Sequence, residues 1–215
     1  MICPCAGRLK KWANLDVRLV AFSVMKERSM TPGAHLLISW LSSVNFVEDS
    51  RERRIITYAG ISPDLDGLGL IVDRFLGNTT YYEDFHHYVG HCGIAAIIIS
   101  IAAAGFAKMQ KLKVFLLSLT VFHLHILCDV IGSKGSDGYQ WPIYYLYPFD
   151  KSFGIIWQGQ WELNAWQNSV IVVILLVTCF YVAQRRHYSF FEVFGSRFDE
   201  EVFKIYKKYL LKNNA

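Results

Sequence analysis

Histidine and aspartate side chains recur at helical spacing within the most apolar stretches of this 215-residue chain. His125 and Asp129 are four residues apart, so both lie on one face if this stretch is helical. His87 and His91 have the same spacing, and His86 directly precedes them. Imidazole and carboxylate groups together suit Zn²⁺, Mn²⁺ or iron, and polar groups within apolar helices are costly unless a partner compensates them. The pattern therefore predicts a buried metal centre.

Two more carboxylates follow the proline of the sequence SPDLD. Pro63 is expected to break or kink its helix, and the break lets Asp64 and Asp66 turn toward one point. His35 opens the first apolar segment, where a lone histidine would by itself be an ordinary helix-end residue. From the residues themselves, the predicted metal ligands are Asp64, Asp66, His91, His125 and Asp129, and His35 and His86 are two further candidates.

The number of ligands bears on the chemistry. Seven exceed the three or four protein ligands of one zinc ion, so the set fits a two-metal site. Such a site would activate a bridging water for hydrolysis, with Asp66 as the general base. A transporter would instead use the same residues to relay protons or pass metal ions, and a non-catalytic protein would use the metal for stability alone. The role of His87 stays open, whereas His123 faces away from His125 and is expected to be a hydrogen-bonded core residue.

The composition indicates contact with a membrane. Hydrophobic residues make up 53% of the chain and charged residues 19%, whereas soluble domains carry about 25% charged residues. The net charge of +4 comes from scattered Lys and Arg residues that form no stripe interleaved with aromatics, which excludes a nucleic-acid-binding surface. The five cysteines show no CxxC spacing, so neither a zinc ribbon nor a thioredoxin-type site is indicated.

Five apolar segments are too long for typical strands and predict helices at residues 34–47, 55–72, 93–107, 114–131 and 170–183. We expect an all-α, up-and-down bundle of about five apolar helices. At 1.5 Å per residue, segments of about 14–18 residues reach roughly 21–27 Å, and the hydrocarbon core of a bilayer is about 30 Å thick. The helices are expected to span a membrane, and a soluble bundle with an unusually apolar core is the alternative.

Basic residues mark one end of this bundle. They follow the first, third and fifth segments, at residues 51–54, 108–113 and 185–186, and the positive-inside rule makes that end cytoplasmic. The aromatic-rich region 132–167 then lies at the opposite end, as a short β-hairpin turning near Asp150 or as a loop cap. The same alternation of helices gathers all the predicted ligands at the aromatic end.

Three regions are expected along the chain. Residues 1–29 form a poorly organised extension without a signal peptide, because the apolar run at 19–24 is shorter than the apolar core of such a peptide. Residues 30–184 form the helical metal-binding domain. Residues 185–215 contain a charged amphipathic helix at about 197–212.

Four stretches together resemble one family, and they are MTPGAHL, AGISPDLDGLG, HHYVGHCG and HLHILCDVIGSKGSDGYQWPIYY. They are similar to the inner-membrane-associated metal-dependent hydrolases, also called LexA-binding membrane hydrolases, over about residues 30–167. That family carries an early His, then Pro-Asp-x-Asp, His-Arg-x-x-Thr-His-Ser and His-x-x-x-Asp. The chain departs at His87, Gly90 and Cys92, where the family has Arg, Thr and Ser, and it keeps every predicted ligand.

The resemblance implies a metal-dependent hydrolase that uses a His/Asp centre to activate water. The expected cofactor is a divalent ion, zinc or manganese, present as one ion or two. The expected location is the cell inner membrane, with several spans and the metal site toward the non-cytoplasmic side. Membrane lipid and a small-molecule or lipid substrate, with an ester or phosphoester to be cleaved, are the expected partners.

Overall fold

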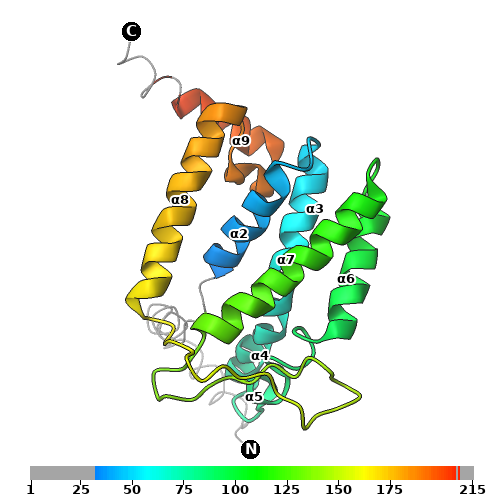
Figure 1. The fold of residues 1–215 in the computed structure, drawn as a ribbon, viewed down its shortest axis with the longest axis vertical. Coiled ribbons are helices and arrows are strands. Elements are labelled where there is room, and N and C mark those ends of the chain that lie inside the picture. The colour runs from blue at the N-terminus through cyan, green and yellow to red at the C-terminus, as the bar shows by residue number, and fades with distance from the viewer. Residues whose placement is uncertain (1–31, 207, 209–215) are drawn as a thin grey trace, which may run out of the picture.

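The computed structural model describes residues 32–206 and 208, and every named element within them is a helix. Five helices run along the long axis in alternating directions (Figure 1), and they are α2 (Pro32–Val44), α3 (Ser50–Ile61), α6 (Gly93–Phe106), α7 (Lys111–Gly132) and α8 (Trp166–Arg186). This arrangement confirms the predicted all-α bundle. Residues 1–29, expected to be an extension, lie outside the described residues.

Three stretches among the described residues are long and apolar enough to cross a membrane: Ser50–Leu76, Lys111–Gly132 and Trp166–Arg186. Helix α8 extends past both ends of its predicted range, and its 21 residues reach about 31 Å at 1.5 Å per residue. That length matches a bilayer core of about 30 Å. Helix α6 is apolar but has only 14 residues.

The predicted break at Pro63 is confirmed. Helix α3 ends at Ile61, and a 3-10 segment, η3 (Ser62–Leu68), leads into α4 (Gly69–Leu76) and α5 (Tyr81–Phe85). The 3-10 geometry follows from the proline near its start, which lacks the N–H that a continuing α-helix would use. Asp73 closes the turn between α4 and α5 by accepting hydrogen bonds from the backbone N–H groups of Tyr81 (2.8 Å) and Tyr82 (2.7 Å).

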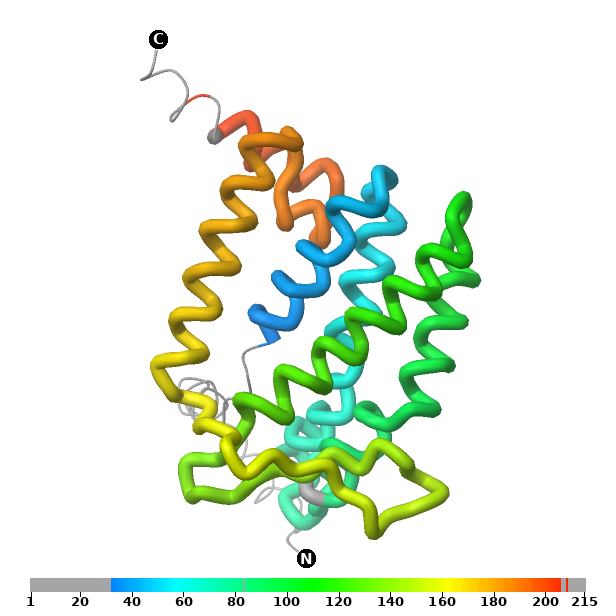
Figure 2. Tube along the Cα trace, in the orientation of Figure 1, coloured from blue at the N-terminus to red at the C-terminus, as the bar shows by residue number. Residues whose placement is uncertain are grey.

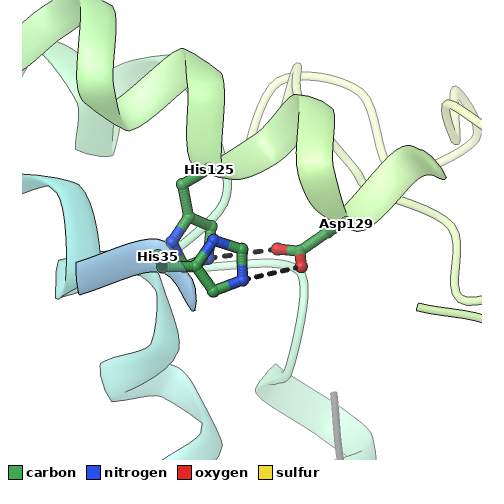
Figure 3. A group of neighbouring side chains, drawn as sticks. All are labelled: His35, His125 and Asp129. Atoms are coloured by element: carbon green, nitrogen blue, oxygen red, sulfur yellow. Dashed lines mark ion pairs between the residues drawn. The ribbon is translucent and has the colours of Figure 1, made fainter. Parts of the chain in front are cut away.

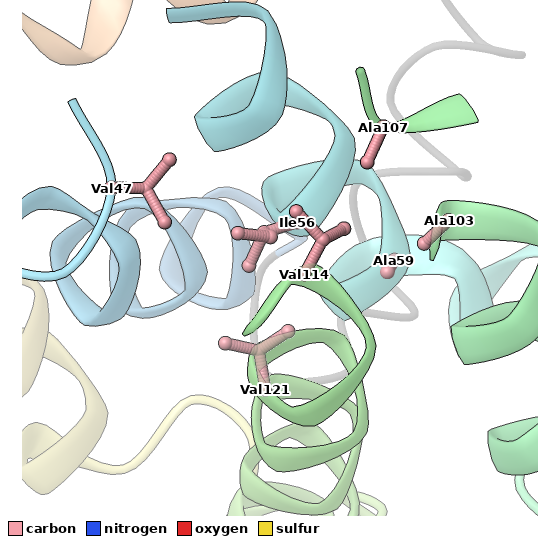
Figure 4. Packing of buried hydrophobic residues seen from close by; sticks show 7 residues of the cluster. All are labelled: Val47, Ile56, Ala59, Ala103, Ala107, Val114 and Val121. Atoms are coloured by element: carbon pink, nitrogen blue, oxygen red, sulfur yellow. The ribbon is translucent and has the colours of Figure 1, made fainter. Parts of the chain in front are cut away.

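Small and β-branched side chains fill the centre of the bundle. Figure 4 shows one cluster of buried residues between α3, α6 and α7: Val47, Ile56, Ala59, Ala103, Ala107, Val114 and Val121. On the other side of α3, a Cβ added at Gly60 would collide with the Ser39 hydroxyl of α2. Close backbone approach through small residues is the usual way in which helices pack within lipid.

A buried ion pair holds the C-terminal segment against the basic end of the bundle. After α8 the chain forms η4 (Phe190–Phe194), which brings the Glu192 carboxylate onto the Arg53 guanidinium at 2.5 and 2.6 Å. The Trp40 indole N–H donates to the same carboxylate at 2.7 Å. Because both charged groups are buried, Arg53 does not belong to the solvent-exposed basic residues of the segment 51–54. The last described helix, α9 (Ser196–Tyr206), covers the first part of the predicted range 197–212, whose end lies outside the described residues apart from residue 208.

Residues 133–165 form a cap at the other end of the bundle, as the trace in Figure 2 shows. Ile143 and Ile155 pair through two backbone hydrogen bonds of 3.1 and 2.9 Å, with Asp150 in the turn between them. This is an isolated bridge without strands on either side, so the loop form of the expected cap is the one observed. The cap is tied to α7 where the backbone N–H of Trp161 donates to the Ile131 carbonyl.

Candidate metal centre

Helix α7 supplies the two side chains at the middle of the site. His125 and Asp129 lie one turn apart and are both buried, and the His125 Nε2 is 3.0 Å from the Asp129 Oδ2. The other ring nitrogen of His125, Nδ1, is 2.8 Å from the carbonyl of Gly60, an acceptor only, so Nδ1 carries the proton in the neutral ring. The Nε2 lone pair is then available to a metal, in the arrangement that metal-binding histidines usually show.

His35 enters from the start of α2. Its ring stacks on that of His125 with centroids 3.8 Å apart, and its Nε2 is 3.3 Å from the Asp129 Oδ1 (Figure 3). The two histidines therefore approach different oxygens of one carboxylate, as the dashed lines in Figure 3 show. Asp129 is the shared centre of this group.

His91 approaches the same carboxylate from the turn before α6. Its Nε2 is 3.3 Å from the Asp129 Oδ2, and its Nδ1 is 2.9 Å from the Asp66 Oδ2. Burial opposes a positive charge on this imidazole, but the carboxylates of Asp129 and Asp66 outweigh it and raise the pKa of His91 to about 9. A bound cation would take the place of that proton.

Asp64 completes the group from η3. Its Oδ1 is 3.5 Å from the His125 Nε2, and its side chain is 17% exposed, against 2% or less for His91, His125 and Asp129. Its Oδ2 is buried and has no hydrogen-bond partner among the described residues. The break at Pro63 thus brings Asp64 beside His125, and Asp64 is the partly exposed member of the group.

The fit of a metal ion rests on atoms that are buried and unpartnered. Within the described part of the chain, the Nε2 atoms of His35, His91 and His125 and both oxygens of Asp129 make no hydrogen bond. Natural proteins rarely leave such groups unsatisfied. The spacings of 3.0–3.5 Å are close to the separation of about 3.3 Å between ligands placed tetrahedrally around a zinc ion at 2.0–2.1 Å. The donors lie at the separations of ligands around an ion, although within the described residues these atoms make no hydrogen bond.

Three overlapping groups of donor atoms lie within 4.8 Å of one another and could hold a metal ion: His35, His125 and Asp129; Asp64, His91 and His125; and His87, His91 and Asp129. Because each group shares a member with the next, they form one continuous centre. It is drawn from α2, η3, the turn before α6 and α7.

His87, whose role stayed open from the sequence, lies at this centre. Its side chain is buried, and its Nδ1 has no hydrogen-bond partner among the described residues. Its backbone has φ of +67°, in the left-handed region that few residues other than glycine adopt. Burial, followed by the neighbouring histidines, lowers the pKa of His87 well below its usual value. A neutral imidazole whose Nδ1 has no hydrogen-bond partner among the described residues is suited to binding a cation.

Asp66 and His86 are placed beside the convergent group. The two oxygens of Asp66 accept from the Nδ1 atoms of His86 and His91, both at 2.9 Å, and from the backbone N–H groups of His87 and Gly90. Asp66 therefore fixes the ring of His91 from behind. A Cβ at Gly90 would collide with the Pro63 carbonyl and the Asp66 carboxylate, so glycine is required there.

His123 is hydrogen-bonded away from the centre, as expected. Its Nδ1 lies 2.7 Å from the Leu119 carbonyl, and its Nε2 lies 2.8 Å from the Tyr145 hydroxyl. A contact that sequence reasoning missed comes from the cap, where the buried Gln160 side chain donates to the Asp129 carbonyl at 2.8 Å. No spacing in the sequence links Gln160 to Asp129, because the connection depends on how a 33-residue loop returns to the helix.

Comparison with known proteins gives one match. The model of a family described as YdjM inner membrane protein matches residues 30–194, which cover α2 to η4 and every donor of the centre. Neither a curated protein nor a solved structure matches the chain. The matched region begins where the structured part of the sequence was expected to begin, and it includes three candidate spans. Since the match covers well over half of the chain, the protein belongs to the YdjM inner membrane protein family.

Proposed function

We propose that the protein is a membrane-embedded, metal-dependent hydrolase. Asp64, His91, His125 and Asp129 would hold the catalytic ion. His35, which faces the other oxygen of Asp129, would hydrogen-bond to that oxygen or bind a second ion. The observation that carries this proposal is the convergence of three unpartnered imidazole nitrogens on the two unpartnered oxygens of Asp129. Two carboxylates with histidines suit zinc or manganese.

When bound, such an ion polarises a carbonyl or phosphoryl oxygen and acidifies a neighbouring water. Asp64 would hold the ion through its Oδ1, which faces the His125 Nε2, while its Oδ2, which has no hydrogen-bond partner among the described residues, would accept a proton from an attacking water. Asp66, predicted from sequence as the base, already accepts four hydrogen bonds. We assign Asp66 to positioning His91, as outer carboxylates do in many metal sites.

The substrate is proposed to be an ester or phosphoester at the membrane surface. The centre lies toward the end of the bundle that carries α4, α5 and the aromatic cap, opposite the turns that carry the basic residues (Figure 1). By the positive-inside rule we propose that the basic end is cytoplasmic and that the centre lies toward the non-cytoplasmic side. Membrane lipid and a small substrate are the proposed partners.

A transporter would need a path from the centre to the basic end as well. The bundle between them is filled by the apolar cluster of Figure 4 and by the Arg53–Glu192 ion pair with its Trp40 partner. Packing of this kind favours a site that opens at one end only, as a hydrolase requires.

The test uses the full-length protein purified in detergent. Bound metal is quantified, and hydrolysis of 4-nitrophenyl acetate and bis(4-nitrophenyl) phosphate is measured before and after chelation. We expect stoichiometric metal, loss of hydrolysis with the chelator, and recovery when Zn²⁺ or Mn²⁺ is added back. His123→Gln should behave like the unchanged protein, because His123 is bonded away from the centre. Metal-loaded protein that hydrolyses neither probe would contradict the proposal.

A further inference from the structure

Two histidines of the metal centre lie on an irregular segment. Residues 86–92, between α5 and α6, form turns rather than a helix, so the side chains there depend on what packs against them. The ring of His91 is fixed by the contact of its Nδ1 with Asp66. The Nδ1 of His87 has no hydrogen-bond partner among the described residues, although the side chain is buried. The orientation of the His87 ring therefore depends on the rings around it.

One of these rings belongs to the cap. Trp141, which is half-buried, has its ring centroid 5.8 Å from that of His87 and 5.6 Å from that of His86, with the planes inclined by 65° and 70°. Edge-to-face contacts at centroid distances of about 4.5–7 Å are favourable between aromatic rings. The His87 ring also contacts that of His91, at 4.6 Å. His87 thus touches Trp141 as well as a proposed ligand of the ion.

The three residues after Trp141 hold this part of the cap in place. Pro142 restricts the backbone of Trp141 to extended conformations. Ile143 is fully buried in an apolar cluster formed with α6 and α7. The backbone N–H of Tyr144 donates to the carbonyl of His87 at 3.3 Å. The cap therefore contacts both the ring and the main chain of His87.

We propose that Trp141 is a positioning residue that holds the His87 ring toward the ion, so that the cap forms part of the metal centre. One ring nitrogen of His87 lies within 4.8 Å of ligand atoms of His91 and Asp129, and a ring free to turn would spend part of its time away from them. The inference rests on the metal ion of the proposed function and not on its hydrolytic step. Coupling between two sites is reciprocal, so a cap that strengthens ion binding is itself stabilised when the ion binds.

The first arm of the test is a double-mutant cycle on Zn²⁺ affinity, measured for the full-length protein in detergent by competition against a chelator of known affinity. Trp141→Ala should weaken Zn²⁺ binding about ten-fold or more, the usual effect of losing an outer partner of a metal ligand, and Trp141→Phe should restore most of the affinity. His87→Asn removes the imidazole and keeps a residue type that tolerates the left-handed backbone there. In the His87→Asn background, Trp141→Ala should have no further effect, because the ring that Trp141 holds is gone.

Tyr139→Ala is the matched control. Tyr139 contacts the ring of Trp141 edge-on at 5.2 Å from the same cap segment, but it is 52% exposed, and no ring contact joins it to a histidine among the described residues. This variant should bind Zn²⁺ with the affinity of the unchanged protein.

The second arm leaves Trp141 in place. Amide hydrogen exchange of the segment 139–145 is compared with and without saturating Zn²⁺, in the unchanged protein and in His87→Asn. Zinc should slow exchange of this segment in the unchanged protein, since the N–H of Tyr144 is bonded to the His87 carbonyl, and should not slow it in His87→Asn.

Equal weakening by Trp141→Ala in the two backgrounds, or a cap that exchanges at one rate with and without Zn²⁺ in the unchanged protein, would overturn the assignment of Trp141 without bearing on hydrolysis. Protein that meets both expectations and hydrolyses neither nitrophenyl probe would keep the assignment and refute the hydrolase. Absence of Zn²⁺ binding by the unchanged protein would overturn both. The exchange measurement decides the matter even if Trp141→Ala fails to fold.

Discussion

Replacing Asp129 by asparagine is the sharpest test of the metal centre. The substitution keeps the shape of the side chain and removes its charge, at a position where one oxygen faces His35 and the other faces His91 and His125 at 3.0–3.3 Å. An amide can offer one oxygen, but its NH₂ group cannot bind a metal. The variant therefore loses a ligand atom and half of the carboxylate charge that Asp64 and Asp129 supply together.

The expected magnitude follows from the position of Asp129. Loss of an outer partner of a metal ligand typically weakens metal binding 10–100-fold, and loss of a direct carboxylate ligand should exceed that. We expect metal binding to weaken by about 100–1,000-fold, which corresponds to about 2.8–4.2 kcal/mol at 1.4 kcal/mol per ten-fold. The fold should persist, because within the described residues the side-chain oxygens of Asp129 make no hydrogen bond that asparagine would lose.

The assay compares Asp129→Asn with His123→Gln, purified side by side, by metal analysis and by competition against a chelator of known affinity. His123→Gln should keep its metal, because its ring contacts only the Leu119 carbonyl and the Tyr145 hydroxyl through hydrogen bonds. Equal metal retention in the two variants would refute the reasoning. The buried histidines and aspartates would then need the proton-relay explanation.

Four further outcomes are expected. Asp66→Asn should weaken metal binding about 10–100-fold in the same chelator competition without abolishing it, since its role is to orient His91; undiminished affinity would contradict that role. Glu192→Ala should lower the free energy of unfolding in detergent by about 3–5 kcal/mol, because it leaves the buried Arg53 unpaired, while Glu201→Ala, in an exposed pair, should not change the melting curve. The chain begun at Met30 should fold and bind metal like the full chain, and loss of either would show that residues 1–29 pack onto the bundle. The protein should stay with membranes through salt and alkali washes, and recovery in the soluble fraction would refute the spanning helices.

Much of the fold followed from local pattern. Apolar runs longer than a strand and free of turn residues predict helices, and the five predicted segments correspond to α2, the α3–α4 stretch, α6, α7 and α8. The break at Pro63 was predictable because proline removes a donor wherever it stands. Helix ends were less well predicted: α3 begins at Ser50, where the Asp49 side chain caps it, although its first turn is charged and lies outside the apolar run.

The candidate site was also predictable only in part. The i, i+4 spacing of His125 and Asp129 determined that they share a face, and alternation of the helices brought His35, Asp64 and His91 to the same end. Residue type and spacing could not assign roles among the seven predicted ligands. Asp64 and Asp66 are two residues apart and look equivalent in sequence. In the described part of the chain, Asp66 accepts hydrogen bonds at both oxygens, whereas the Oδ2 of Asp64 has no partner.

The sequence by itself determined which helices form, where one of them breaks, and which end of the bundle carries the imidazoles and carboxylates, because these depend on periodicity and on chain direction. Only the tertiary structure decided that Asp129 stands at the middle of the donors and that His87 joins them. It also decided that Glu192 forms an ion pair with Arg53, 139 residues away in the sequence, at the opposite end of the bundle. The physical reason is that metal binding and burial of charge depend on distances of a few ångströms between side chains from different helices. Such distances are set by how the helices pack, which no local spacing encodes.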